Sequence, residues 1–529
     1  MASPTSSNPA RPPQASTQPL VLGVVDIGAS AIRLVVGQDV PGSHPEVLEE
    51  ASRAVLLGRD TFSTGRISAA TMDAAIRALT GFRALMNSYG VTRVRAVATS
   101  AVREAANAET FLDRVRVRTG LDVEMIDGSE ESRLTYLAVS DQLDAHAAFA
   151  AECALLVEVG GGSVDVTRLA SGEPVQAGVY PLGAIRMRQR LGSWHGSHEQ
   201  RIRLLSGQVE NVVGDIVDEI PVSDAAFVVA LGGDMRFVAA HLAGEGDQHG
   251  VREITRDQFL AFVADVARCD DDDLAARFQL SPVQAETLVP AMLVYRAIVV
   301  QTQAARIVVP DVSLRDGLLL DLAGAGTANP ADFAPHVLAS AMSLGARYKY
   351  DAAHAAAVAR LATRLFDLLA PEHALGTRDR LLLEVAALLH DIGLFVSLRG
   401  HHKHSMYLLQ ASEIFGLSRD DMQVVGMIAR YHRRGVPQKS HPEFMRLDRD
   451  ERVRVTKMAA LLRLANALDA EHEQKVTDLS LQEQDTSWIF ELTGRGDLTM
   501  ERLAASSRAD LLVEVFGRQV EVRGAGAGS

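Results

Sequence analysis

The feature that most constrains the fold is a strand-and-turn pattern that occurs three times in the first half of the chain. In residues 21–37 (VLGVVDIGASAIRLVVG) and 155–169 (LLVEVGGGSVDVTRL), an apolar arm leads to an acidic residue, one spacer, a glycine turn and a second arm. Both segments predict β-hairpins. A third copy of the arm and turn, FVVALGGDMR, occupies residues 227–236. This recurrence predicts a duplicated α/β lobe.

The remaining pattern predicts further domains. Residues 69–89 and 105–118 have helical spacing, and residues 338–470 are almost continuously helical. The sequence GAGTANPADFAP, which follows Ala323, marks a linker before this helical region. The last part of the chain returns to alternating apolar and polar residues, which favours a small β or α+β unit. Its alternating segments are VTDLSLQ, WIFELTG, LLVEVFG and VEVRG. The expected units are a disordered leader (1–20), lobe I (21–136), lobe II (137–322), an all-α domain (323–472) and a small C-terminal α+β domain (473–529).

Composition excludes several classes of protein. The 529 residues include 53 Lys+Arg and 67 Asp+Glu, and the net charge of −14 argues against a nucleic-acid coat. No apolar run approaches the roughly 18 to 20 residues of a membrane helix, so we expect no membrane partner. The leader lacks the apolar core of a signal peptide, and Cys153 and Cys269 have no metal-ligand spacing. We therefore expect a cytoplasmic protein.

The two hairpin turns are candidate phosphate sites. Glycine lets backbone N–H groups approach an anion closely, and two facing turns would clamp a phosphate. Asp26 and Glu158 each stand two residues before a turn glycine, where their carboxylates would repel a phosphate unless a hard cation lay between them. Mg²⁺ is the natural cation for such ligands.

Five motifs in order make the chain similar to the Ppx/GppA phosphatase family. They are DIGASAIR at 26–33, TSAVREAAN at 99–107, DGSEESRL at 127–134, VEVGGGSVDV at 157–166 and LRDGLL at 314–319. The resemblance implies two actin/Hsp70/sugar-kinase-like (ribonuclease H-like) α/β lobes. It also implies a homodimer.

The resemblance implies roles for single residues. Glu131 matches the family's catalytic glutamate, which activates water, and Arg103 matches an arginine that contacts the phosphoryl group. The implied phosphate-binding residues are Gly28, Ala29, Ser30, Ala31, Arg33, Gly160, Gly161, Gly162 and Ser163. Ala29-Ser30-Ala31 departs from the family's Ser-Asn-Ser, and Glu158 replaces its metal-binding aspartate.

The helical region carries a second pattern. HD at 390–391, GHHKHS at 400–405 and RYHRR at 430–434 resemble the third, HD-like domain of the long exopolyphosphatases. His354, His390, Asp391 and Asp469 are candidate ligands of a divalent metal there. The cationic runs 401–404 and 430–434 are alternatively a surface that grips a long polyanion.

These observations predict an exopolyphosphatase that releases orthophosphate from inorganic polyphosphate by Mg²⁺-assisted attack of water. Guanosine pentaphosphate 5′-phosphohydrolase activity is the alternative reaction. A non-catalytic polyphosphate- or alarmone-binding regulator is the non-enzymatic alternative. An ATP-dependent kinase is a third alternative. Asp234, beside the turn of residues 232–233, argues against a kinase because an acid there would repel a nucleotide phosphate.

Overall fold

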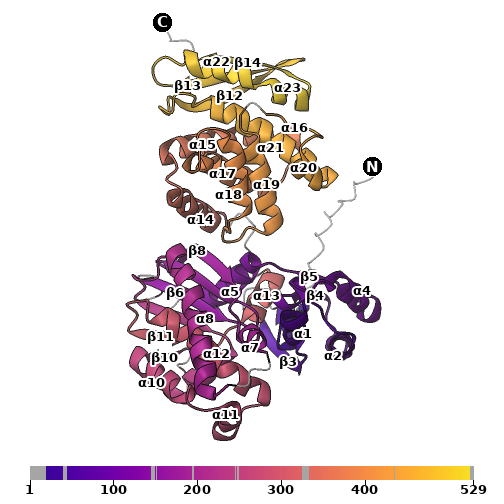
Figure 1. Ribbon diagram of the computed structural model, residues 1–529. Coiled ribbons are helices and arrows are strands. Elements are labelled where there is room, and N and C mark those ends of the chain that lie inside the picture. Colours follow the sequence, from indigo (N-terminus) through magenta and orange to yellow (C-terminus); the bar gives the residue numbers. More distant parts are fainter. Residues whose placement is uncertain are drawn as a thin grey trace, which may run out of the picture.

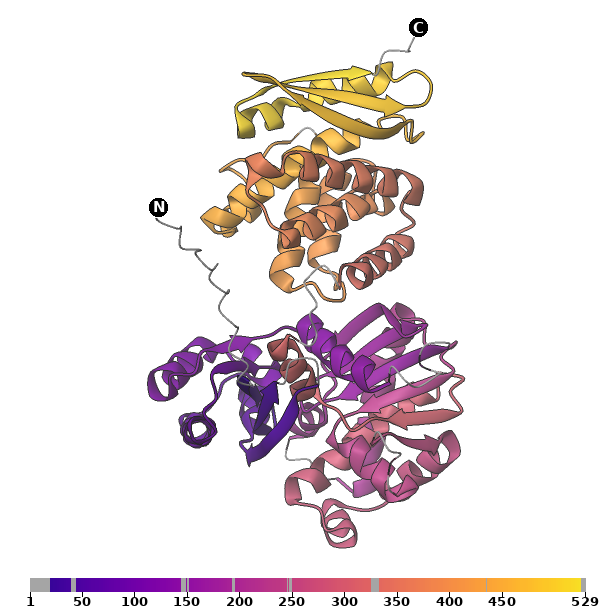
Figure 2. The ribbon, with the colours of Figure 1, turned by 180° about the vertical axis from the view of Figure 1, so that it is seen from behind.

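In the computed structural model of the chain, two α/β lobes lie beneath a helical part, and a small sheet covers the far end of that part (Figures 1 and 2). The structure describes residues 20–39, 44–143, 149, 152–192, 196–244, 246, 250–324, 333–433 and 435–524. Residues 1–19 of the expected leader, most of the linker and Arg434 lie outside these residues, whereas Leu20 begins the first strand. Among the helices described, none has the length and apolar character needed to span a bilayer.

The first lobe is built on a five-stranded sheet with the order β3-β2-β1-β4-β5. Its strands are β1 (Leu20–Ile27), β2 (Ala31–Asp39), β3 (Glu46–Ala54), β4 (Arg93–Ala98) and β5 (Val123–Met125). Its helices are α1 (Leu57–Thr64), α2 (Ala69–Ser88), α3 (Ser100–Arg103), α4 (Ala108–Thr119) and α5 (Gly128–Leu143). The central strands β1 and β2 are rich in β-branched residues and almost wholly buried, as a sheet covered on both faces requires.

The second lobe repeats this topology. In its six-stranded sheet, β8-β7-β6-β9-β11 has the same sequence of antiparallel and parallel pairings as β3-β2-β1-β4-β5, and β10 is added at the edge. The strands are β6 (Cys153–Val159), β7 (Val164–Ala170), β8 (Glu173–Tyr180), β9 (Phe227–Leu231), β10 (Arg252–Thr255) and β11 (Arg306–Val309). The helices are α7 (Ala184–Leu191), α8 (His198–Glu219), α9 (Gly233–Ala243), α10 (Arg256–Val266), α11 (Asp271–Phe278) and α12 (Pro282–Val299). The duplicated lobe that the hairpins predict is therefore confirmed.

Helix α13 (Leu314–Ala323) returns the chain to the first lobe, where it packs beside α5 and β1. Leu318 and Leu319 of α13 share a buried cluster with Leu22 and Val24 of β1. This packing brings residues just before and within α13 to the carboxyl end of the central strand β1, where Arg315 lies 3.8 Å from Asp26.

The helical part follows as the sequence predicts. Its helices are α14 (Ala334–Arg347), α15 (Ala352–Leu368), α16 (Ala370–His373), α17 (Thr377–Leu389), the 3₁₀ helix η1 (Ile392–Phe395), α18 (His401–Gln410), α19 (Arg419–Arg430), α20 (Pro442–Arg446) and α21 (Arg449–Ala467). The contacts that join it to the lobes include the bond from the Arg419 N–H to Asp127 Oδ2 at 2.7 Å, the ion pair of Arg347 with Glu219 at 2.9 Å and the edge-to-face contact of Phe415 with the Tyr136 ring. The N-terminal end of α19 therefore faces the lobes.

The C-terminal sheet corrects one expectation. LLVEVFG lies mostly in α23 (Asp510–Phe516) and is not a strand. The sheet has the order β12-β13-β14, formed by β12 (Val476–Glu483), β13 (Ser487–Gly494) and β14 (Gln519–Gly524). Because β13 and β14 are parallel, the chain must cross between the two strands, and α22 (Thr499–Arg508) and α23 make that crossover. Trp488 and Phe490 of β13 belong to the same core as the helices.

The packing of α13 on α5 depends on Gly317. A Cβ there would lie 1.9 Å from the carbonyl oxygen of Leu134, and backbone atoms cannot move aside cheaply. Gly317→Ala should therefore destabilise the lobes by about 1–3 kcal/mol, measured by thermal unfolding. Gly81→Ala is the matched control, because Gly81 lies in the exposed interior of α2 with open space around it, and should stabilise by up to about 1 kcal/mol. Equal effects of the two substitutions would contradict the close packing.

Candidate phosphoryl-transfer site

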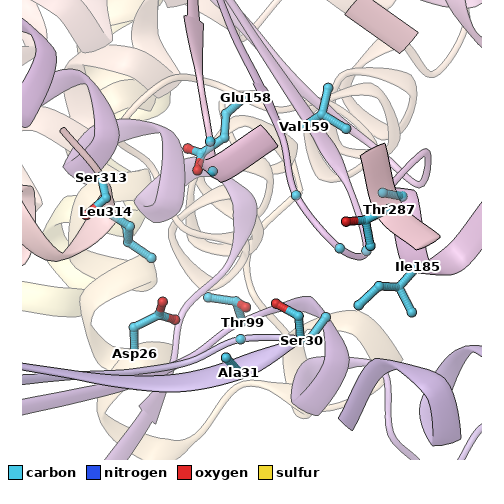
Figure 3. Close-up of a pocket in the computed structure, with 18 of the residues that line it drawn as sticks. Asp26, Ser30, Ala31, Thr99, Glu158, Val159, Ile185, Thr287, Ser313 and Leu314 are labelled. Atoms are coloured by element: carbon cyan, nitrogen blue, oxygen red, sulfur yellow. The ribbon is translucent and has the colours of Figure 1, made fainter. Parts of the chain in front are cut away.

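A cavity of about 460 Å³ lies between the two lobes (Figure 3). Both hairpin turns line it, and Figure 3 shows Asp26 and Glu158 entering it from different sides. Of the residues that the sequence assigns to phosphate, catalysis and Mg²⁺, the cavity brings together all except Arg103. These are Asp26, Gly28, Ala29, Ser30, Ala31, Arg33, Glu131, Glu158, Gly160, Gly161, Gly162 and Ser163.

The two turns face each other in the cavity. Each is closed by one backbone bond, from Gly28 N–H to the Ala31 carbonyl at 3.1 Å and from Gly160 N–H to the Ser163 carbonyl at 2.9 Å. A Cβ on Gly161 would lie 2.8 Å from the Ala29 Cβ, so glycine is needed there because the turns touch. This arrangement is the one expected of a phosphate clamp.

Strand register pairs each acid with a different partner. In the first hairpin Asp26 lies opposite Arg33, and its Oδ2 is 3.7 Å from Arg33 Nη1 and 3.8 Å from Arg315 Nη1. In the second hairpin Glu158 lies opposite Asp165, another acid. Only the first hairpin therefore neutralises its own carboxylate across the strands.

Burial away from water shifts the pKa values of the acidic side chains in the cavity. Burial raises the pKa of Asp26, although Arg33 and Arg315 oppose the shift. Burial is also the main cause of the raised pKa of Glu158, and it raises that of Asp165 well above its ordinary value, with repulsion from Glu131 adding to it. Burial thus makes ionisation of these carboxyl groups less favourable than in water.

Glu131 stands in the first turn of α5 and is buried. Its Oε1 lies 2.6 Å from Arg103 Nη1, which also donates to the Ile126 carbonyl. Burial outweighs this ion pair and raises the pKa of Glu131 to about 7. Arg103 itself lines a neighbouring cavity of about 300 Å³ that reaches Glu413 and Arg419 of the helical part.

Several residues of the cavity were not singled out from the sequence. Asp165 could have been found by counting across the turn of residues 160–163, since Glu158 must then pair with Asp165. Arg315 lies in the LRDGLL motif but was given no role. Arg236, from α9, also had no predicted role. Asp234, which the sequence places beside the turn of residues 232–233, comes from the same helix and lines the cavity, and burial raises its pKa to about 6.

The candidate metal ligands of the helical part lie together only in part. One ligand atom from each of His354, His390 and Asp391 falls within a group no wider than 4.8 Å. Asp469 contacts His354 instead, with its Oδ2 at 2.8 Å from His354 Nδ1. His401, which the sequence placed in a cationic surface run, is buried against Asp391.

The raised pKa of Glu131 predicts a pH-dependent stability. The folded protein holds this proton more tightly than the unfolded chain, whose carboxyl has the ordinary value of 4.5, so stability falls as pH rises from 4.5 to about 7. Glu131→Gln removes this loss. The free energy of unfolding of Glu131→Gln minus that of wild type should therefore be about 2–3 kcal/mol larger at pH 8 than at pH 5, measured by denaturant unfolding at both values. A difference that does not change with pH would show that burial does not hold this proton.

Comparisons with known proteins agree with the motif order. The model of the Ppx/GppA phosphatase family matches residues 35–325, and that of Ppx/GppA phosphatase, domain III, matches residues 338–507. Exopolyphosphatase 1 of Mycobacterium leprae is 27% identical over 303 residues, which are 56% of this chain and 88% of that protein. Exopolyphosphatase 1 of Mycobacterium tuberculosis H37Rv is 28% identical over 303 residues, 56% of this chain and 87% of that protein.

Solved structures share the fold. The Aquifex aeolicus member of the Ppx/GppA family has a TM-score of 0.50 and 24% identity, covering 59% of this chain and 99% of that one. An exopolyphosphatase from Cytophaga hutchinsonii has a TM-score of 0.53 and 22% identity, covering 58% of this chain and 98% of that one. These likenesses confirm the actin-like α/β fold of the two lobes. Because the Ppx/GppA phosphatase family model matches more than half of its length, the chain belongs to that family.

Proposed function

We propose that this member of the family is an exopolyphosphatase, which releases terminal orthophosphate from inorganic polyphosphate. The observation that carries the proposal is the position of Glu131, a buried carboxylate with a pKa of about 7, in the cavity lined by two facing glycine turns. The similarity to proteins named exopolyphosphatase 1 supports polyphosphate as the substrate.

The residues of the cavity suit hydrolysis of a phosphoanhydride. The backbone N–H groups of the two turns hold the terminal phosphoryl group, and Arg33 and Arg315 offset its charge. Glu131 accepts a proton from water as the water oxygen bonds to phosphorus and the bond to the bridging oxygen breaks. Orthophosphate and the shortened chain leave, and Glu131 returns its proton to solvent. Arg103 positions Glu131 through their ion pair.

The carboxylates of the cavity fit Mg²⁺. Asp165 Oδ1 is buried without a hydrogen-bond partner among the described residues, and Glu158 receives only the Thr135 hydroxyl, at 3.2 Å. In the described part of the cavity no three ligand atoms are gathered within 4.8 Å, which suits an ion that takes its other ligands from substrate phosphate and water. Asp26 and Glu158 would hold the ion, which when bound polarises the phosphoryl oxygens.

Several predictions about the helical part and about the whole chain stay predictions. A metal bound by His354, His390, Asp391 and Asp469 stays a prediction, as do the HD-like character of this part, the homodimer, the cytoplasmic location and the domain boundaries. Of the cationic residues expected to grip long chains, Lys403 and Arg433 are exposed. Guanosine pentaphosphate is tested beside polyphosphate below.

Glu131→Gln tests the base. It should lower kcat for phosphate release from polyphosphate by about 10²–10⁴ while KM changes little, because the base acts in the transition state and the turns hold the ground state. Glu124→Gln is the control: Glu124 is an exposed acid in the middle of β5, and this substitution should keep wild-type rates. Wild-type kcat in Glu131→Gln would exclude Glu131 as the base.

The dependence of phosphate release on divalent metal ions provides a second test of the proposed function. Phosphate release should stop in chelator and return with added Mg²⁺. Glu158→Gln should raise the Mg²⁺ concentration for half-maximal rate at least about tenfold, because it removes a charged ligand. Undiminished activity in chelator would contradict a cation at this site.

Substrate choice provides a third test. Rates of phosphate release from long polyphosphate, tripolyphosphate and guanosine pentaphosphate should be compared under the same conditions. The proposal predicts the highest kcat/KM for polyphosphate, whereas a higher value for guanosine pentaphosphate would reassign the substrate. Binding of polyphosphate without any phosphate release would instead indicate a regulator.

A further inference from the structure

A buried arginine joins the second glycine turn to the first lobe. Arg186 of α7 is only 8% exposed. Its Nε donates to the Gly162 carbonyl at 2.5 Å, and its Nη2 donates to Glu104 Oε1 at 2.5 Å. Its guanidinium carbon lies 4.1 Å from the centre of the Phe62 ring, in a cation–π contact. Gly162 belongs to the second lobe, whereas Glu104 and Phe62 belong to the first, so this side chain bridges the two lobes.

The start of α7 holds the carbonyl groups of the second turn. The backbone N–H groups of residues 184–186 donate to the carbonyls of Gly160 and Gly161 at 2.9–3.0 Å. The Arg186 side chain supplies the donor for the next carbonyl, that of Gly162. Three successive peptide groups of the turn therefore direct their oxygen atoms towards α7.

The planarity of these peptide groups fixes the opposite side of the turn. In a trans peptide the C=O and the N–H of the following residue point in opposite directions. Since the carbonyls of residues 160–162 point towards α7, the N–H groups of residues 161–163 point away from it. Residues 160–163 line the cavity between the lobes. These N–H groups are among those that hold the terminal phosphoryl group in the proposed function.

The peptide group between Gly162 and Ser163 differs from the two before it. Backbone donors hold the carbonyls of Gly160 and Gly161, whereas a side-chain donor holds that of Gly162. The direction of the Ser163 N–H therefore depends on the side chain of Arg186, which a substitution can remove.

Arg186 acts through the turn and not on the substrate. It is not among the residues that line the cavity between the lobes or the neighbouring cavity at Arg103. Its partner Glu104 directly follows Arg103, which forms the ion pair with Glu131. One side chain thus connects the second turn to the segment that orients the base.

We propose that Arg186 is a positioning residue for phosphate release. It holds the peptide group between Gly162 and Ser163 so that the Ser163 N–H is directed at the terminal phosphoryl group, and Glu104 anchors its guanidinium. This inference rests on the proposed function, because it requires an anion between the two turns. Without Arg186 the Gly162 carbonyl loses its donor, and the N–H on the other side of the same peptide group loses its fixed direction.

The affinity for tripolyphosphate tests this role. Each chain also carries Glu131→Gln, so that the ligand is not hydrolysed, and the dissociation constant is measured by calorimetry with Mg²⁺ present. Arg186→Met keeps a long side chain beside Phe62 but removes both donors, and it should raise the dissociation constant about 10- to 100-fold. Arg188→Met is the matched control on the same helix. Arg188 pairs with Asp271 outside the cavity, so the dissociation constant should stay within about threefold.

A charge-neutral pair of substitutions separates position from charge. Arg186→Met together with Glu104→Gln keeps the net charge of the chain and should bind as weakly as Arg186→Met alone. Glu104→Gln alone should stay within about threefold, because the Glu104 side chain is 42% exposed and the Gly162 bond remains. Unchanged affinity in a folded Arg186→Met chain, or recovery of affinity in the double variant, would overturn the proposal.

Hydrogen exchange gives an independent measurement if Arg186→Met fails to fold. In the Glu131→Gln chain, bound tripolyphosphate should slow amide exchange, followed by mass spectrometry, in peptides that contain residues 161–163. Bound ligand without any slowing there would overturn the proposal. Both measurements remain informative if the chain releases no phosphate from polyphosphate, because they follow binding alone. Failure of the proposed function is therefore distinguishable from failure of this inference.

Discussion

Carboxylates removed from water dominate the site between the lobes. Four acids, Asp26, Glu131, Glu158 and Asp165, line one cavity, and burial raises the pKa of each. Arginines stand beside Asp26 and Glu131, whereas Glu158 lies opposite a second acid. Ionising all four without added positive charge would be strongly unfavourable. A cation between the carboxylates is the means by which such a cavity can admit a polyanion while Glu131 stays ionised to act as the base.

Strand pairing sets this charge pattern. Each hairpin places an acid two residues before its turn, and antiparallel register then fixes the residue opposite. Duplication of the lobe brings the two turns into contact, with Ala29 against Gly161. Helix α13 completes the site by delivering Arg315 from the far end of the lobe sequence. The chemistry thus follows from a repeated β-hairpin and one returning helix.

The sequence predicted what depends on local pattern. Both hairpins, their glycine turns and the helical part were found because strand arms, glycines and helical spacing lie close together in the chain. Asp165 was missed although hairpin register would have given it. Arg236 and Arg315 required tertiary packing, since they come from segments distant from the turns. LLVEVFG was misassigned because a short apolar run suits helix and strand equally, and only the parallel pairing of β13 and β14 decides.

In the helical part, too, the sequence predicted one group of residues but not the contacts that depend on how the helices pack. Of the four residues predicted as a group, His354, His390 and Asp391 lie together, whereas Asp469 contacts His354 instead. The approach of His401 and His432 to the same carboxylate depends on how η1, α18 and α19 pack, which residue spacing does not reveal. A cationic surface run and a set of buried histidines therefore look alike in sequence.

The central claim is that a terminal phosphoryl group binds between the two glycine turns beside a cation. The most direct measurement is a crystal structure of Glu131→Gln with tripolyphosphate and Mn²⁺, using anomalous scattering to locate the ion. The account predicts the terminal phosphate in contact with the turns of residues 28–31 and 160–163, and manganese next to Asp26 and Glu158. A phosphate bound elsewhere, with no ion near these carboxylates, would contradict it.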